Sequence, residues 1–137
     1  MIVYTDSLDG ITPDQLRGFF VGWPDPPTPE RHRDLLRGSA EIVLAVDTEA
    51  ARVVGFVTAI SDGVLAAFIP LLEVLPTYQG QGIGSELVRR MLEKLAPLYA
   101  VDLTCDARLQ PFYARFGMQP YTGMIRRRYD RQSGREG

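Results

Sequence analysis

The sequence has very little of the residues that build disulfides and metal sites. Among 137 residues there is one cysteine, Cys105, and one histidine, His32. A single cysteine excludes an intrachain disulfide, and the two residues together are too few for the usual zinc clusters. We therefore expect no metal, and the scarcity of cysteine is consistent with a reducing, cytoplasmic compartment.

A strong charge of one sign and long apolar runs are missing as well. The formal net charge is −2 and the isoelectric point is about 5.4, which argues against a protein that grips nucleic acid by bulk electrostatics. The apolar runs VVGFVTAI and VLAAFIPLL are far shorter than the ~20 residues that cross a bilayer. The N-terminus also lacks the pattern of a signal peptide. We expect neither nucleic acid nor a membrane as partner.

The length and composition are those of one soluble globular domain. Hydrophobic residues make up 45% of the chain and charged residues 23%, which is ordinary for such a domain. A chain of this length can bury one core but not two. We expect a single domain over residues 1–130 and a polar, flexible tail over residues 131–137.

Local start and stop signals divide the chain into helices and strands. A threonine followed by a proline predicts a helix start at Thr12 and another at Thr28. A rigid proline-rich loop separates the two helices, and Gly38 ends the second one. Strands are predicted over 2–4, 41–46, 52–61, 64–74, 99–105 and 123–129, and further helices over 81–96 and 109–117. The central strands are apolar on both faces, so a mixed α/β domain with a covered sheet is expected.

Three glycines at alternate positions, Gly80, Gly82 and Gly84, stand at the start of the helix predicted over 81–96. Such a turn exposes backbone N–H groups at a helix N-terminus and can cradle an anion. The absence of a Gly-Lys-Ser/Thr sequence excludes a P-loop, and the G-x-G-x-G spacing departs from the dinucleotide fingerprint. A turn that merely allows close helix packing is the plain alternative.

The same stretch, VLPTYQGQGIGSELVRRMLEKL, resembles motif A of the GCN5-related N-acetyltransferases, in which a strand ending in V-x-P is followed by Q/R-x-x-G-x-G/A and a helix. Gln79, Gly82 and Gly84 occupy the defining positions. Downstream, LQPFYARFGMQP is similar to the family's motif B, and the resemblance covers about residues 40–125. It implies an α/β (α+β) fold with a mixed, mostly antiparallel sheet of six to seven strands flanked by about four helices.

The resemblance also implies a co-substrate, acetyl-CoA. In the family, amides of the glycine turn hold the pyrophosphate, the strand backbone pairs with the pantetheine arm, and one amide faces the thioester carbonyl. The implied coenzyme-binding residues are Leu72, Val74, Gln79, Gly80, Gln81, Gly82, Ile83, Gly84 and Ser85. Pyrophosphate suits a helix N-terminus, and pantetheine amides suit an open strand edge.

Two catalytic candidates follow from the resemblance and from acyl-transfer chemistry. The family places a tyrosine at Tyr113, where it would protonate the leaving thiolate, although Tyr113 also shares an apolar helix face and could be a core residue. Glu73 is the one carboxylate in an apolar strand and is the candidate general base. The alternative is that Glu73 points to solvent or pairs with an arginine of a neighbouring strand.

Several positions stay open. Where many family members have a coenzyme-binding asparagine, this chain has CDAR, so Asp106 does not inherit that role, and Cys105 is read as a structural thiol rather than a nucleophile. Phe19, Phe20 and Trp23 could line an acceptor pocket or pack in the core. The predicted activity is acetyl transfer from acetyl-CoA to a primary amine of a small molecule, and the alternative is a non-catalytic acyl-CoA-binding or regulatory module. A homodimer is left open.

Overall fold

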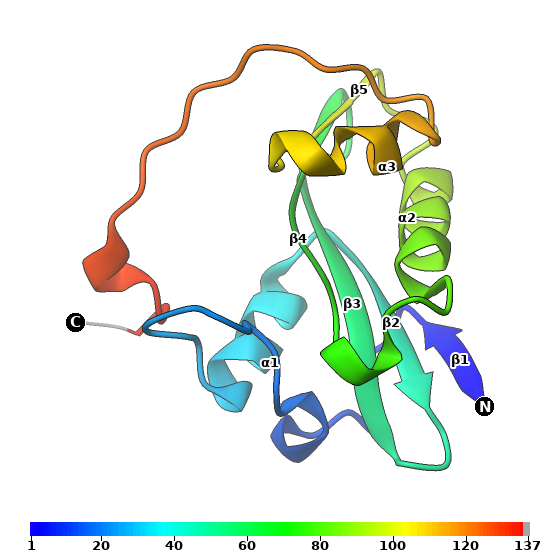
Figure 1. The fold of residues 1–137 in the computed structure, drawn as a ribbon, viewed down its shortest axis with the longest axis vertical. Coiled ribbons are helices and arrows are strands. Elements are labelled where there is room, and N and C mark those ends of the chain that lie inside the picture. Colours follow the sequence, from blue (N-terminus) through cyan, green and yellow to red (C-terminus); the bar gives the residue numbers. More distant parts are fainter. Residues whose placement is uncertain (136–137) are drawn as a thin grey trace.

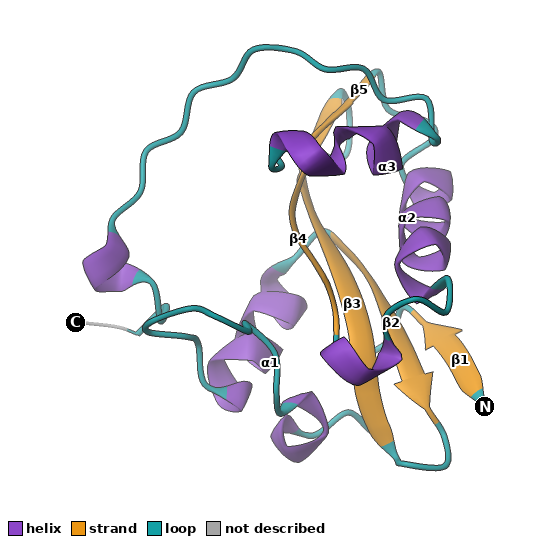
Figure 2. Cartoon of the chain, in the orientation of Figure 1, coloured by secondary structure: helices purple, strands orange, loops and turns teal. Residues whose placement is uncertain are grey.

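A five-stranded sheet forms the centre of the computed structural model, which describes residues 1–135 (Figures 1 and 2). The strands lie in chain order, with β1–β4 antiparallel and β5 parallel to β4. Their bounds are β1 Ile2–Thr5, β2 Glu41–Asp47, β3 Arg52–Ser61, β4 Ala66–Val74 and β5 Ala100–Asp102. Each predicted strand from residue 2 to residue 102 is therefore found, with β5 shorter than expected.

Three α-helices accompany the sheet: α1 Pro29–Gly38, α2 Ile83–Lys94 and α3 Gln110–Ala114. Thr28 caps α1 by accepting a hydrogen bond from the Arg31 backbone N–H, as the Thr-Pro signal predicts. The first Thr-Pro signal, at Thr12, starts only a short 3-10 helix, η1 Pro13–Leu16. Gly18 follows with a φ of +93°, a conformation that stops a helix before it can grow.

The two faces of the sheet are covered by different elements. On one face, Gly55 leaves room for α2: a Cβ atom there would lie 3.1 Å from Leu87 Cδ1 and 3.3 Å from Ile83 Cγ2. On the other face, Phe56 packs against the rings of Phe19 and His32. Since both faces are buried, the strands are apolar on both sides, as the sequence pattern indicates.

A β-bulge interrupts β4 near its middle. Phe68 lies opposite Ile60 and Leu71 lies opposite Thr58, so Ile69 and Pro70 together face a single residue of β3. Proline has no N–H to donate, and within sheets it is tolerated at such bulges. The pairing of β4 with β5 ends at Phe68, just before the bulge, because a bulge bends its strand away from the neighbour.

The expected sheet of six to seven strands and the expected four helices are wrong for the described residues, which contain five strands and three α-helices. The predicted strand at 123–129 has no partner strand among the described residues: residues 118–128 run as an extended loop that arches past β5 toward the C-terminal end (Figure 1). A Cβ atom at Gly123 would lie 3.9 Å from Thr104 Cγ2. The run GMIRRRY is interpreted as a last strand from the sequence alone, but a strand also requires a neighbour with which to exchange hydrogen bonds.

After this loop the chain returns to α1. A short 3-10 helix, η4 Tyr129–Arg131, is followed by the buried Ser133. The Gln132 side chain accepts a hydrogen bond from the Asp25 N–H, and Arg31 donates to the Gly134 carbonyl. The predicted polar tail, 131–137, is thus packed back over part of its length, while residues 136–137 lie outside the described part of the chain.

His32 is the one buried imidazole of the core, with 1% of its surface exposed. It lies in a box of Phe19, Phe20 and Phe56, and neither ring nitrogen has a hydrogen-bond partner among residues 1–135. Burial lowers the pKa of His32 from 6.5 to about 4, so the ring is neutral at neutral pH.

Because the pKa of His32 is lower in the folded chain, the unfolded chain binds more protons between pH 6.5 and 4. The stability is therefore present at neutral pH and is lost as the pH falls through this window. Between pH 7 and pH 5 we expect the free energy of unfolding to drop by roughly 2 kcal/mol through this residue. Urea titrations at the two pH values should show the drop in the wild type and a much smaller one in His32→Leu. An equal drop in both proteins would contradict the prediction.

Candidate active site

An open strand edge forms the first part of the site. The Leu75 N–H donates to the Val54 carbonyl at 2.9 Å, so 54 and 75 form a hydrogen-bonded pair of the antiparallel ladder. Pairs alternate along such a ladder, which makes Gly55–Val74 and Val57–Leu72 non-hydrogen-bonded pairs. The backbone groups of Leu72 and Val74 consequently point away from β3. They also extend beyond β5, which pairs only with residues 66–68.

One of these backbone groups already has a partner. The Gln79 side chain donates from Nε2 to the Val74 carbonyl oxygen at 3.0 Å. Gln79 itself is exposed and stands at the end of the short 3-10 helix η2 Pro76–Tyr78. The amide of Gln79 therefore ties the glycine turn to the strand edge, a contact that the sequence did not predict.

The glycine turn is built by its backbone conformation. Gly80 and Gly82 have φ values of +80° and +84°, in the left-handed region, and Gly82 is the N-cap of α2. Gly84 is helical, and a Cβ atom there would lie 3.8 Å from Val74 Cγ2 and 4.0 Å from Phe112 Cζ, which is ordinary contact. The left-handed backbone of the turn thus requires the first two glycines. The third leaves no side chain protruding between β4, α2 and α3.

The other predicted residues of the turn contribute in different ways. Gln81 is exposed and Ser85 is half-buried, so their side chains remain within reach of a ligand. The Ile83 side chain is buried in the core, and only its backbone can face a ligand. Since α2 begins at Ile83, its first N–H groups and the positive end of its dipole are directed at the turn.

Arg115 is a residue of this site that the sequence analysis missed. Its guanidinium donates from Nη2 to Ser85 Oγ at 2.9 Å and lies over the ring of Phe112. It therefore brings a positive charge from the end of α3 to the glycine turn. The sequence signal was one basic residue inside the apolar helix predicted over 109–117 (FYARF), but nothing local places it beside a turn 30 residues earlier in the chain.

The carboxylate at the start of α2 does not leave the turn negative. Glu86 Oε2 lies 2.6 Å from Arg89 Nη2 and 2.6 Å from Arg90 Nε. Hydrogen bonds from the two guanidinium groups lower the pKa of Glu86 to about 2. Arg89 also pairs with Glu93 at 3.1 Å, so two arginines balance two carboxylates. The attraction of an anion to the N-terminal end of α2 therefore rests on its free N–H groups and its dipole.

Tyr113 lies on α3 beside Phe112, with ring centroids 4.9 Å apart. Because Phe112 borders Gly84, and Gly84 borders Val74, the strand edge, the turn and α3 meet at one place. Burial raises the pKa of the half-buried Tyr113 phenol, and the nearby Cys105 thiol raises it further. The phenol is therefore a proton donor at neutral pH, and it is neither fully buried nor fully exposed.

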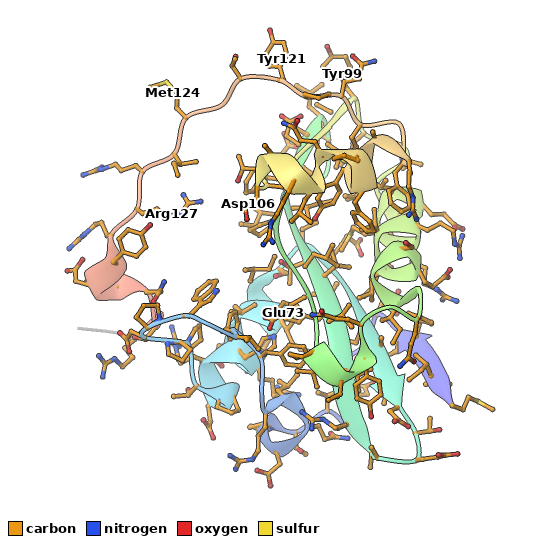
Figure 3. The ribbon with its side chains drawn as sticks, in the orientation of Figure 1. Glu73, Tyr99, Asp106, Tyr121, Met124 and Arg127 are labelled. Carbon is orange, nitrogen blue, oxygen red and sulfur yellow. The ribbon has the colours of Figure 1, made fainter. Side chains whose placement is uncertain are left out.

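Glu73 is held differently from either expectation. Its carboxylate accepts hydrogen bonds from the backbone N–H groups of Phe20 at 2.8 Å and Val21 at 3.3 Å. It therefore neither points freely to solvent nor pairs with an arginine. Phe20 has a φ of +63°, unusual for a residue with a side chain. Glu73 lies on β4 (Figure 3). It is paired with Phe56, so it holds this strained loop on the sheet face opposite α2.

The aromatic residues of that loop divide between core and surface. Phe19 and Phe20 are buried against Phe56 and are core residues. Trp23 contacts the Phe20 ring and stays 37% exposed, which leaves it as the one of the three that can contact an acceptor. Asp106 is exposed and pairs with Arg108 at 3.6 Å.

Residues 1–135 contain neither a candidate metal site nor a helix suited to a membrane. No group of three or more histidine, cysteine, aspartate or glutamate side chains is placed to hold a metal ion in this part of the chain. Among the helices described, none is both long enough and apolar enough to cross a membrane.

The model of the acetyltransferase (GNAT) family matches residues 8–118, a span that includes the strand edge, the glycine turn and α3. The chain belongs to this family. The match confirms the resemblance drawn from the two sequence motifs. GNAT membership supports acyl transfer in general terms, and it leaves the acceptor undetermined. No curated protein matches the sequence.

Solved structures agree with this assignment. A protein from Deinococcus radiodurans R1 assigned to the acetyltransferases is 50% identical, with a TM-score of 0.95 over 99% of this chain and 94% of that one. A GNAT family protein from Streptococcus pneumoniae TIGR4 is 32% identical, with a TM-score of 0.73 over 93% and 98% of the two chains. Glucosamine-6-phosphate N-acetyltransferase from Arabidopsis thaliana, at 15% identity and a TM-score of 0.70 over 95% and 99%, shares the fold.

The two kinds of glycine in the turn should respond differently to alanine. Gly82→Ala places a side chain at a φ of +84°, and we expect it to lower the free energy of unfolding by about 1 kcal/mol. Gly84→Ala is the matched control, since its helical position meets only ordinary contacts and alanine favours helix by roughly 0.5–1 kcal/mol. Denaturant unfolding compares the two. Equal destabilisation by both substitutions would show that the backbone conformation is not what selects glycine at 82.

Proposed function

We propose that this GNAT protein is an N-acetyltransferase that moves an acetyl group from acetyl-CoA to a primary amine, most simply of a small molecule, in a ternary complex. The observation that carries the proposal is the meeting of an unpaired strand edge with an anion-binding turn. Leu72 and Val74 present backbone groups beyond the end of β5, and the glycine turn adjoins them through Gly84. A ligand with amides at one end and a pyrophosphate at the other fits this surface.

The residues of the chain support distinct parts of the reaction. Amides of the turn and the N-terminus of α2 suit the pyrophosphate, with Arg115 as an additional cation. The Val74 backbone suits the pantetheine arm, whose amide N–H would take the place of the Gln79 side chain at the Val74 carbonyl. The Leu72 N–H suits the negative charge that grows on the thioester oxygen during attack.

Tyr113 is the proposed general acid. As the neutral amine nitrogen bonds to the thioester carbon, the carbon–sulfur bond breaks and the departing thiolate takes a proton from Tyr113. The proton that the nitrogen releases passes to a base or to solvent, and the Tyr113 phenolate is then reprotonated from solvent. Burial keeps the phenol protonated at neutral pH, and its place on α3 beside the strand edge suits proton delivery to the sulfur.

Tyr113→Phe removes only this proton and should lower kcat by ~10²-fold, within the usual range for general acid catalysis. The KM for acetyl-CoA should change little, since the ring remains. A decrease in kcat of less than about fivefold at the optimal pH would exclude the acid role. Phe116→Tyr, just after the end of α3, serves as a control for changes to the same segment.

Glu73 has two candidate roles, and one variant separates them. As a base, acting through water, it would set the rising limb of the pH–rate profile. As a structural acceptor, it holds the Phe20–Val21 backbone beside the acceptor side of the sheet.

Glu73→Gln keeps the shape of the side chain but removes its charge. If Glu73 is the base, we expect kcat to fall and the rising limb to shift in pH. If it only holds the loop, the limb stays where it is, and the KM for the amine rises together with a loss of stability of about 1–3 kcal/mol. An unchanged limb therefore rules out the base role.

The most informative experiment is an amine panel. Free thiol released from acetyl-CoA is measured across primary amines, with wild type and Tyr113→Phe compared under the same conditions. Thiol release that requires an amine and is abolished by Tyr113→Phe would support the proposed N-acetyltransferase activity. Stabilisation by acetyl-CoA in a thermal shift assay without release across the panel would instead support a non-catalytic acyl-CoA-binding module. Stabilisation by NAD(H) and not by acetyl-CoA would contradict both.

A further inference from the structure

The tip of the glycine turn has little support of its own. Gly80 and Gln81 are exposed and form no hydrogen bond with any other described residue. A Cβ atom built at Gly80 or at Gly82 would meet no atom within 4 Å other than those of its chain neighbours. The position of the turn is therefore set by the segments on its two sides. These are α2, which begins with the buried Ile83, and the short helix η2, which ends at Tyr78.

The side chain of Tyr78 fixes the upstream segment. Its hydroxyl donates to Asp47 Oδ2 at 2.7 Å, across 31 positions of the chain. Within the segment, the Tyr78 N–H donates to the Leu75 carbonyl at 2.9 Å, and the Gln79 N–H donates to the Pro76 carbonyl at 3.3 Å. Because η2 is a single turn of helix, a bond that holds its last residue also holds the residue with which the glycine turn begins.

The carboxylate that accepts this bond is itself held in place. Asp47 is the last residue of β2, and its second oxygen, Oδ1, accepts the N–H groups of Glu49 at 3.0 Å and Ala50 at 3.3 Å. Its partner in the ladder is Arg52 of β3, whose guanidinium donates to the Arg17 carbonyl. The hydroxyl at the end of η2 therefore bonds to the closed end of the β2–β3 hairpin, which belongs to the central sheet.

The protonation states of the two side chains favour this bond. The hydrogen bond from the Tyr78 phenol lowers the pKa of Asp47, and the same bond raises the pKa of Tyr78. At neutral pH the carboxylate is charged and the phenol keeps its proton. A hydroxyl that donates to an anion forms a shorter and stronger bond than one between neutral groups. The Tyr78 ring packs against the core, so Tyr78→Phe would remove the bond and keep the packing.

We propose that Tyr78 is a positioning residue for the coenzyme, since its hydrogen bond to Asp47 holds the glycine turn in the conformation that accepts a pyrophosphate. The side chain acts through the backbone of residues 79–82 and touches neither the ligand nor the reacting atoms. A turn that is already ordered loses little conformational freedom when the ligand binds, which raises the affinity. The inference rests on the proposed function, because it takes the turn as the pyrophosphate site.

The test uses CoA alone, titrated into the full chain in a calorimeter. Tyr78→Phe should raise the dissociation constant of CoA roughly tenfold, the usual effect of losing one hydrogen bond to a charged group. In the thiol-release assay the KM for acetyl-CoA should rise with it. The kcat should stay within about twofold, because Tyr113 is unchanged.

Tyr4→Phe is the matched control. It also removes the hydroxyl of a half-buried tyrosine, but this hydroxyl forms no hydrogen bond with residues 1–135, and the Arg90 guanidinium would remain over the ring. The dissociation constant of CoA should not change in this variant. An equal rise in Tyr4→Phe and Tyr78→Phe would overturn the proposal, because the loss of affinity would then not depend on the bond to Asp47.

A double-mutant cycle assigns the effect to the bond itself. Asp47→Ala removes the acceptor, and Tyr78→Phe in that background should change the dissociation constant of CoA by less than about twofold. Effects that multiply in the double variant would reject the Tyr78–Asp47 bond as the cause.

Two further outcomes separate this inference from the proposed function. A wild type that binds CoA while Tyr78→Phe loses only stability, with an unchanged dissociation constant, would overturn the positioning role alone. A wild type that binds no CoA at millimolar concentration would overturn the proposed function and the positioning role together.

Discussion

The β-bulge at Ile69 and Pro70 is the constraint on which the rest of the site depends. Before the bulge, β4 directs backbone groups toward β5, as the hydrogen bond from Ala100 to the Leu65 carbonyl shows. After the bulge the alternation is shifted by one residue, and Leu72 and Val74 direct theirs to an open edge. The bend also separates β4 from β5. One extra residue thus creates both the unpaired edge and the space beside it.

The rest of the site is assembled against this edge. Val74 of β4 and Phe112 of α3 both border Gly84. Arg115 then links α3 to Ser85, and Gln79 links the turn to the Val74 carbonyl. The end of β4, the glycine turn with the start of α2, and α3 are therefore held together by contacts at Val74, Gly84 and Ser85.

Local patterns in the sequence were enough to place most of the fold. Periodicity and caps located the strands and helices up to residue 114, because those signals act within a few residues. The strand at 123–129 could not be predicted correctly, since pairing depends on a neighbour that the local sequence does not specify. The bulge at Pro70 was also missed. A proline inside an apolar run marks a bulge only when the register of the partner strand is known.

The same limit applies to the side chains of the site. Gln79 and the glycines of the turn were found from motif spacing, but the hydrogen bonds of Glu73 to Phe20 and Val21 connect residues more than fifty positions apart. No local signal reveals such a partner. A carboxylate in an apolar strand does indicate that some partner exists, because an isolated buried charge is unfavourable, and that much of the prediction was sound.

The segment between the bulge and Pro76 has a further property. Residues 71–75 alternate strictly: odd positions exchange hydrogen bonds with β3, and even positions face the open edge. Glu73 reaches the loop on one face of the sheet while its two neighbours present their backbone to the edge. Insertion or deletion of one residue here would turn the backbone groups that bond to β3 toward the open edge, and those at the edge toward β3. The exposed turn at 61–65 has no such alternation. Length variation among homologous chains should therefore be absent between Pro70 and Pro76 and tolerated in that turn.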